Sequence, residues 1–144
     1  MKGENDMKKA VKLAAFMLVS VMLVMTLVSC SSYGKIEKNF KDAGYTEVEL
    51  DETANKIVAE LEEGSISCTA HLWKTESAVL DIIPVYALVL EFGSEGDIDK
   101  AIEESGTISG MIEDVQKSEL VRDNCLLVPF SLTKLEEMKE IFNK

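Results

Sequence analysis

Two rhythms of apolar and polar residues run along this chain, and together they predict alternating helices and strands. Residues 34–43 and 52–63 place apolar side chains at the three- and four-residue spacing of a helix, and a glycine follows each segment. Residues 45–50 and 66–73 instead alternate between apolar and polar positions, which is typical of half-buried strands. The order predicted for this stretch is therefore helix, strand, helix, strand.

The second half of the chain continues the alternation. Residues 84–92 (PVYALVLEF) are almost continuously apolar, which predicts a central strand buried on both faces. Asp97 is placed to cap the next helix, and glycines at 106 and 110 are expected to break it. Residues 125–130 (CLLVPF) predict a last strand, entered through a tight turn at 123–124, and a capping box at Thr133 predicts a C-terminal helix.

This order of elements predicts the fold class. A βαββαβ arrangement indicates an α+β, ferredoxin-like fold, in which a four-stranded antiparallel sheet has the strand order 4-1-3-2. Extra N- and C-terminal helices are expected to cover the second face of the sheet, because the strand at 84–92 is apolar on both sides. The pattern predicts one domain over residues 35–144.

The N-terminal region has the layout of an export signal. Three lysines between residues 8 and 12 precede residues 13–28, which carry no charge and are short for a membrane-spanning helix of about 20 residues. Leu27-Val28-Ser29-Cys30 then resembles the lipobox of bacterial lipoproteins. The resemblance implies transfer of diacylglycerol to the Cys30 sulfur and cleavage before Cys30 by the type II signal peptidase. An uncleaved anchor helix is the alternative, and Met7 is an alternative start.

The resemblance also implies an organisation and a location. Residues 1–29 are expected to be the signal peptide, and residues 30–34 a lipidated tether. The remainder resembles small uncharacterised bacterial lipoproteins and is expected at the outer, extracytoplasmic face of the cell membrane. Its expected partners are the membrane, through lipid on Cys30, and an envelope protein. The function predicted is a small non-enzymatic binding or accessory module without a cofactor.

The charge of the chain narrows the choice of ligands. The full sequence has a net charge of −11, and from Cys30 onward 11 basic and 24 acidic side chains leave a net charge of −13. Such a field repels nucleic acid and anionic lipid headgroups, so neither is expected as a direct ligand of the folded domain. The favoured explanation of the acidity is that it keeps the exported protein soluble. The alternative is that acidic residues form a docking face for a basic partner or a weak cation site.

A thiol-dependent enzyme or redox protein is the alternative function, and it would use Cys68, Cys125 and His71. His71 is the single histidine of the chain, so a histidine-assisted nucleophile would have to include it. In the predicted strand order the two cysteines lie on opposite edges of the sheet, which predicts that both are unbonded. No spacing typical of a zinc site or a phosphate-binding loop occurs, so no metal site is predicted.

One strand carries large side chains at its more polar positions. His71 and Trp73 alternate there with the apolar residues of the strand at 66–73, which is predicted to be an edge strand. Together they form the candidate surface for contact with a partner. For Trp73, packing into the core beneath a terminal helix is the favoured alternative, because large aromatic side chains are usually mostly buried.

Overall fold

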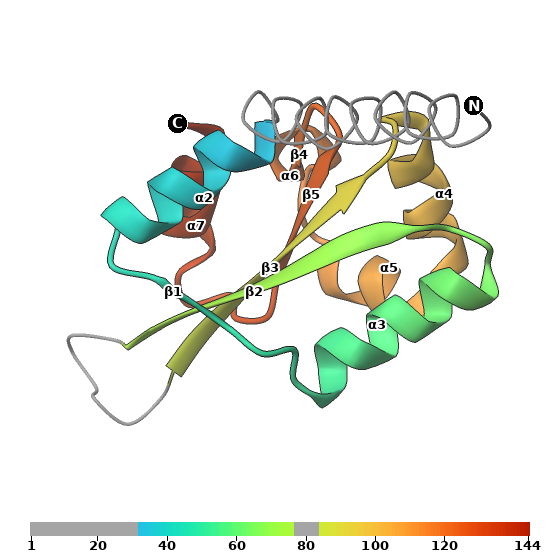
Figure 1. The fold of residues 1–144 in the computed structure, drawn as a ribbon, viewed down its shortest axis with the longest axis horizontal. Helices are drawn as coiled ribbons and strands as arrows, with labels where there is room; N and C mark the ends of the chain where they lie inside the picture. Colours follow the sequence, from blue (N-terminus) through green and yellow to red (C-terminus); the bar gives the residue numbers. More distant parts are fainter. Residues whose placement is uncertain (1–31, 77–83) are drawn as a thin grey trace, which may run out of the picture.

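The computed structural model describes residues 32–76 and 84–144, so the export signal and Cys30 lie outside the described part (Figure 1). It shows an α+β fold in which the described residues form a five-stranded antiparallel sheet and six helices. The strands are β1 (Thr46–Val48), β2 (Cys68–Glu76), β3 (Pro84–Phe92), β4 (Val121–Arg122) and β5 (Cys125–Pro129). The helices are α2 (Ser32–Asp42), α3 (Glu52–Glu63), α4 (Gly96–Glu104), α5 (Gly106–Ile112), α6 (Lys117–Leu120) and α7 (Leu135–Asn143).

The central strand predicted at 84–92 is confirmed as β3, which begins at Pro84. It pairs antiparallel with β2 along the full length of both strands, from Cys68↔Phe92 to Glu76↔Pro84. On its other side it pairs with β5 over five residues. Consecutive side chains of a strand point to opposite faces, so the buried run 87–90 supplies apolar side chains to both.

The strand order is β1-β2-β3-β5-β4, and this corrects the predicted ferredoxin-like order. That order would place the strand at 45–50 in the middle of the sheet, parallel to 84–92. Instead β1 is a short edge strand, antiparallel to β2. The physical reason lies in its side chains: Thr46 and Glu47 are exposed and only Val48 is half-buried, whereas a central strand needs apolar residues on both faces.

A fifth strand completes the opposite edge. The predicted turn at 123–124 is present, and Asp123 takes it with a left-handed backbone (φ 52°). The turn joins the two-residue strand β4 to β5. Arg122 is held in place because its Nη1 donates a hydrogen bond to the Phe142 carbonyl at 2.8 Å. The end of α7 thus secures this edge of the sheet.

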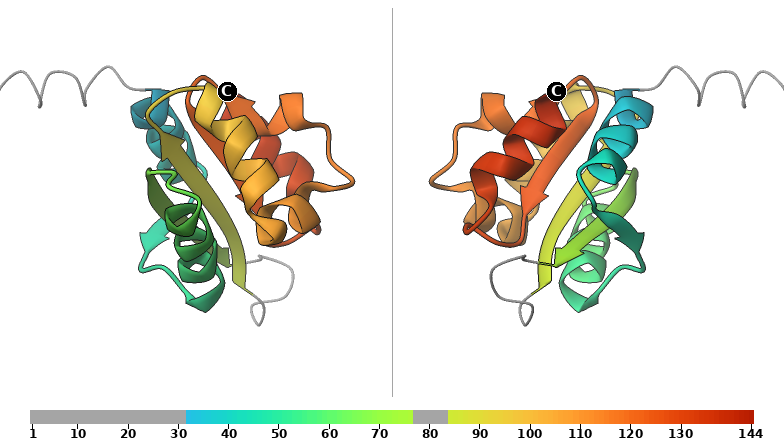
Figure 2. Two further views of the ribbon diagram at one scale, coloured as in Figure 1. Left: turned by 90° about the vertical axis from the view of Figure 1, so that its right-hand side faces the viewer. Right: turned by 90° about the vertical axis from the view of Figure 1, so that its left-hand side faces the viewer.

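Helices cover both faces of the sheet, and the terminal helices cover one of them as expected. Figure 1 shows α2 and α7 on one side of the strands and α3, α4 and α5 on the other. The side views agree, because α3 and α4 stand in front of the sheet from one side and α2 and α7 from the opposite side (Figure 2). The core therefore has two apolar layers, separated by β2, β3 and β5.

Helix starts differ from the predictions in three places. The helix predicted over 52–63 is confirmed as α3, and the Asp51 side chain caps it by accepting a hydrogen bond from the Ala54 amide at 2.8 Å. Asp97 and Thr133 are not the capping residues of α4 and α7, which begin at Gly96 and Leu135 without a side-chain cap. The glycines at 106 and 110 were expected to break a helix, but both lie within α5. Ser105, which precedes Gly106, caps that helix.

A buried polar group joins the helices of one layer. Ser105 is fully buried, and its hydroxyl accepts from the Ile108 amide and donates to Glu60 Oε2 at 2.5 Å. Thr107 Oγ1 donates to the other carboxylate oxygen of Glu60 at 2.7 Å. These hydrogen bonds, the one from Ser105 foremost, lower the pKa of Glu60. They fix α3 against the start of α5.

Candidate functional site at the free edge of the sheet

Within residues 32–76 and 84–144, strand β1 has a neighbouring strand on one side only. It pairs with β2 over three residues, from Thr46↔Lys74 to Val48↔Leu72, and ends the sheet on that side. Among the described residues, no backbone hydrogen bond other than those to β2 involves residues 46–49. In an antiparallel pair, alternate residues turn their N–H and C=O groups away from the partner strand. The outer side of β1 therefore presents backbone groups that an added strand would satisfy.

The side chains of this edge differ between the two faces of the sheet. Glu47 lies opposite Trp73, so it belongs to the face that α2 covers, and Glu49 is exposed directly after the last residue of β1. The pairing of Thr46 with Lys74 places Thr46 and Val48 on the other face, together with Lys74 of the neighbouring strand. The edge is thus acidic along one face and combines a hydroxyl with an apolar side chain along the other.

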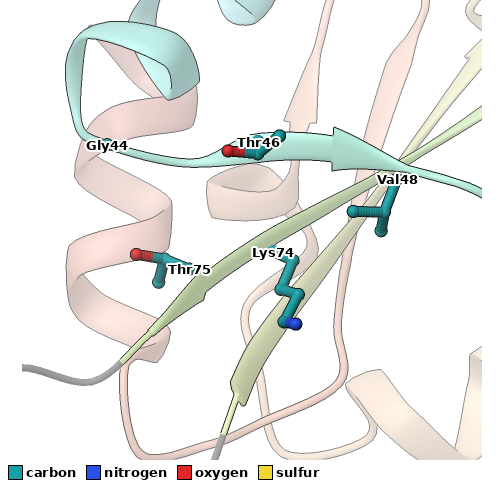
Figure 3. Close-up of a pocket in the computed structure, with 5 residues that line it drawn as sticks. All are labelled: Gly44, Thr46, Val48, Lys74 and Thr75. Atoms are coloured by element: carbon teal, nitrogen blue, oxygen red, sulfur yellow. The ribbon is translucent and has the colours of Figure 1, made fainter. Parts of the chain in front are cut away.

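A hollow of about 470 Å³ lies at the start of this edge. It is lined by residues of β1, of β2 and of the turn before β1: Gly44, Thr46, Val48, Lys74 and Thr75 (Figure 3). Gly44 has a left-handed backbone (φ 89°), which a side chain would strain. This conformation turns the chain from α2 toward β1. Just before β1, the Tyr45 amide donates to the Phe40 carbonyl of α2 at 2.9 Å.

His71 fixes Glu47 from behind the edge. Its Nδ1 lies 2.7 Å from Glu47 Oε1, and its Nε2 lies 4.0 Å from Glu91 Oε2. The imidazole also stacks on the Tyr33 ring of α2 at a centroid distance of 3.8 Å. The side chain of His71 is only 16% exposed as a result. It therefore positions the acidic edge and offers little surface of its own.

Trp73 belongs to the core. It is fully buried beneath α2 and stacks on Phe40 with the ring centroids 5.7 Å apart. This is the core-packing alternative considered for the residue. A fully buried indole gives a partner nothing to contact, so Trp73 does not belong to the contact surface predicted at His71 and Trp73.

Four buried polar side-chain atoms in the same layer lack a hydrogen-bond partner within the described part of the chain. They are the Tyr33 hydroxyl, the Tyr45 hydroxyl, His71 Nε2 and Trp73 Nε1. Burial, followed by the carboxylates of Glu47 and Glu37, raises the pKa of Tyr33 far above its usual value. The indole of Trp73 acts to lower the pKa of Tyr33, but the indole N–H is not in hydrogen-bond geometry with the Tyr33 hydroxyl. The layer beneath α2 thus packs well but leaves polar groups unsatisfied.

The three residues of the thiol alternative do not meet. Cys68 pairs with Phe92, whereas Cys125 pairs with Glu91, so the two cysteines point to opposite faces with β3 between them. His71 shares a face with Cys125 but lies two strands away. Burial raises the pKa of Cys68, and burial with the nearby Glu91 raises that of Cys125 to about 12. Both thiols stay protonated at neutral pH, unlike a nucleophilic cysteine.

Both cysteines are free, as predicted, but for a different reason. They do not lie on opposite edges of the sheet; they flank the same central strand. Two strand spacings put their Cα atoms roughly 10 Å apart, beyond the ~7 Å limit for a disulfide.

Two further hollows lie elsewhere on the described surface. One, of about 370 Å³, includes Asp99 and Lys117, which form an exposed ion pair. The other, of about 360 Å³, includes Cys68 and Glu91 at the end of β2 and β3. Neither gathers three histidine, cysteine or carboxylate side chains, and no such group occurs within residues 32–76 and 84–144.

Sequence reasoning missed Glu47 and Glu49 as site residues. Their signal was present, since acidic residues alternate with Thr46, Val48 and Leu50 in a segment with few apolar positions. It indicated a strand, but it did not indicate that this strand ends the sheet.

Among the described residues, no helix is long and apolar enough to cross a membrane. No protein-family model matches the chain, and no curated protein or solved structure is similar enough to count as a match.

Proposed function

We propose that this protein is a lipid-anchored, extracytoplasmic binding module. The observation that carries the proposal is the lipobox-like Leu27-Val28-Ser29-Cys30, which follows a basic and then an apolar segment. Diacylglycerol on Cys30 would supply two acyl chains, and two chains hold a protein stably at a membrane where one does not. The net charge of −13 from Cys30 onward opposes electrostatic attraction to anionic lipids, so the lipid itself has to provide the attachment.

The fold supports a role in binding at some distance from the lipid. Helix α2 begins at Ser32, two residues after Cys30, so an anchor at Cys30 holds the first turn of α2 at the membrane. The helix has 11 residues and is therefore about 16 Å long. Its far end leads through the turn at Gly44 into the edge strand β1 (Figure 3). An anchor at Cys30 would thus be attached at one end of α2, and the free edge follows the other end.

The anchor is tested by the variant Cys30→Ser in cells supplied with labelled fatty acid. We expect the variant to take up no label and to accumulate as the uncleaved precursor, because it lacks the sulfur that accepts the lipid. Cys68→Ser is the matched control, since it removes a thiol from the folded domain and should leave both labelling and cleavage unchanged. A Cys30→Ser protein that is still cleaved and labelled would show that the proposed anchor is wrong.

A further inference from the structure

We propose that the free edge of β1 binds a basic, extended segment of a partner protein, which adds to the sheet as a sixth strand. This inference names the partner class of the binding module proposed above, and in that sense rests on it. It goes further because it assigns the binding surface, the mode of binding and the residue pattern of the partner. The proposal is based on the outer edge of β1, which is unpaired in the described structure and has acidic side chains on one face only.

The backbone supplies the first part of the argument. The outer side of β1 has no neighbour in the described structure, and it belongs to a sheet whose next strand, β2, is held along nine residues by β3. The edge is therefore rigidly presented. An extended peptide that lies along it forms main-chain hydrogen bonds irrespective of its sequence, and this is a common mode of peptide recognition.

The side chains supply the specificity. Residues of an added strand that lie beside Glu47, and beside the exposed Glu49 just past the end of β1, would meet carboxylates, and opposite charges across a strand pair stabilise the pairing. Residues that lie beside Thr46 and Val48 would meet a small, partly apolar surface next to the hollow at Lys74. The matching partner segment consequently alternates basic residues with apolar, β-branched ones.

Charge also selects between a partner protein and a second copy of this chain. Two β1 strands paired edge to edge would bring Glu47 and Glu49 of each copy together, and like charges across a strand pair destabilise it. The net charge of −13 from Cys30 onward repels a second copy at long range and attracts a basic segment. The Glu47 side chain stays 41% exposed although His71 Nδ1 lies 2.7 Å from its Oε1, so it remains accessible to a basic residue of the partner.

The test uses the full chain, purified in detergent, and a blocked eight-residue peptide that alternates lysine and valine. Calorimetry should detect binding to the wild type, and the amides of residues 46–49 should exchange hydrogen more slowly when the peptide is present. The same peptide with alternate backbone nitrogens methylated keeps its charge but cannot form the main-chain bonds. We expect it not to bind. Equal binding of the methylated peptide would overturn strand addition.

A pair of charge-reversal variants separates this edge from the overall acidity of the protein. Glu49→Lys should weaken peptide binding about five- to tenfold, because it exchanges an attraction at the edge for a repulsion. Glu63→Lys changes the net charge equally at an exposed position at the end of α3, and it should weaken binding less than twofold. Equal weakening by both variants would overturn the proposed site. Unchanged thermal midpoints will show that both variants are folded.

The experiment also separates this proposal from that of the anchor. Peptide binding in detergent does not depend on lipid at Cys30. A wild-type protein that takes up fatty acid but does not bind the peptide would overturn strand addition and leave the anchor standing. A protein that binds the peptide but takes up no fatty acid would overturn the anchor and leave strand addition standing.

Discussion

At the scale of single residues, two buried polar groups show opposite solutions to the same problem. Ser105 is buried with its hydroxyl hydrogen-bonded as both donor and acceptor. Tyr33 is buried with its hydroxyl unpaired in the described structure. A buried polar atom without a partner costs about 1–3 kcal/mol, whereas a satisfied one contributes modestly to stability. Removing the Tyr33 hydroxyl should therefore stabilise the protein, whereas removing the Ser105 hydroxyl should destabilise it.

We predict that Tyr33→Phe stabilises the protein. The substitution keeps the ring that stacks on His71 and removes only the unpaired hydroxyl. The free energy of unfolding should rise by about 1 kcal/mol, measured by urea denaturation. Tyr86→Phe changes a half-buried tyrosine in the same way and should have almost no effect. A loss of stability in Tyr33→Phe would mean that this hydroxyl has a hydrogen-bond partner in solution.

At the scale of secondary-structure elements, the described helices are held by a few specific contacts in addition to their apolar faces. Glu60 is the clearest case, because its carboxylate accepts hydrogen bonds from Ser105 and Thr107 and so joins α3 to α5. The sequence pattern indicated the helix at 52–63 from its own periodicity but contained no sign of this link. The contact depends on how α3 and α5 pack, which periodicity does not determine.

The link through Glu60 predicts a dependence of stability on pH. The hydrogen bonds lower the pKa of Glu60 in the folded state, so its contribution is fully present above the pKa of the unfolded chain and is lost as the pH falls through the folded-state value. Glu60→Gln should lose about 1–2 kcal/mol of stability at pH 7, because hydrogen bonds to a charged group are replaced by weaker ones.

Denaturation of wild type and Glu60→Gln between pH 7 and pH 3 measures this effect. The difference between the two proteins should shrink as the pH falls, since protonation of Glu60 removes the same charge that the variant lacks. Glu63→Gln alters an exposed carboxylate near the end of the same helix and should leave the pH profile unchanged. A difference that stays constant over this range would contradict the role of the Glu60 charge.

At the scale of the whole molecule, the strand order decides which residues meet. It places β3 between β2 and β5, which separates Cys68 from Cys125 and puts them on opposite faces. It also places β1 at an edge, which exposes Glu47 and leaves a backbone free for a partner. The candidate site and the absence of a cysteine pair thus follow from one property of the fold.

The two thiols should therefore remain free and should react at different rates. A thiol reagent should modify both Cys68 and Cys125 in unreduced, denatured protein. In the native protein Cys68, which lines an open hollow, should react first, and Cys125 should stay protected because it is fully buried and its pKa is raised to about 12. Mass spectrometry of labelled peptides measures both. A disulfide between them would be incompatible with this sheet.

The sequence by itself determined the central strand, the helix at 52–63 and the two-sided core. The apolar run 84–92 could only be a strand covered on both faces, and the helix at 52–63 followed from its spacing, because these signals lie within one segment. The lipobox-like motif likewise rests on consecutive residues and remains a prediction. Only the tertiary structure decided that β1 ends the sheet and that Trp73 lies beneath α2. Strand order depends on pairing between distant segments, and alternation within a strand does not specify its neighbour.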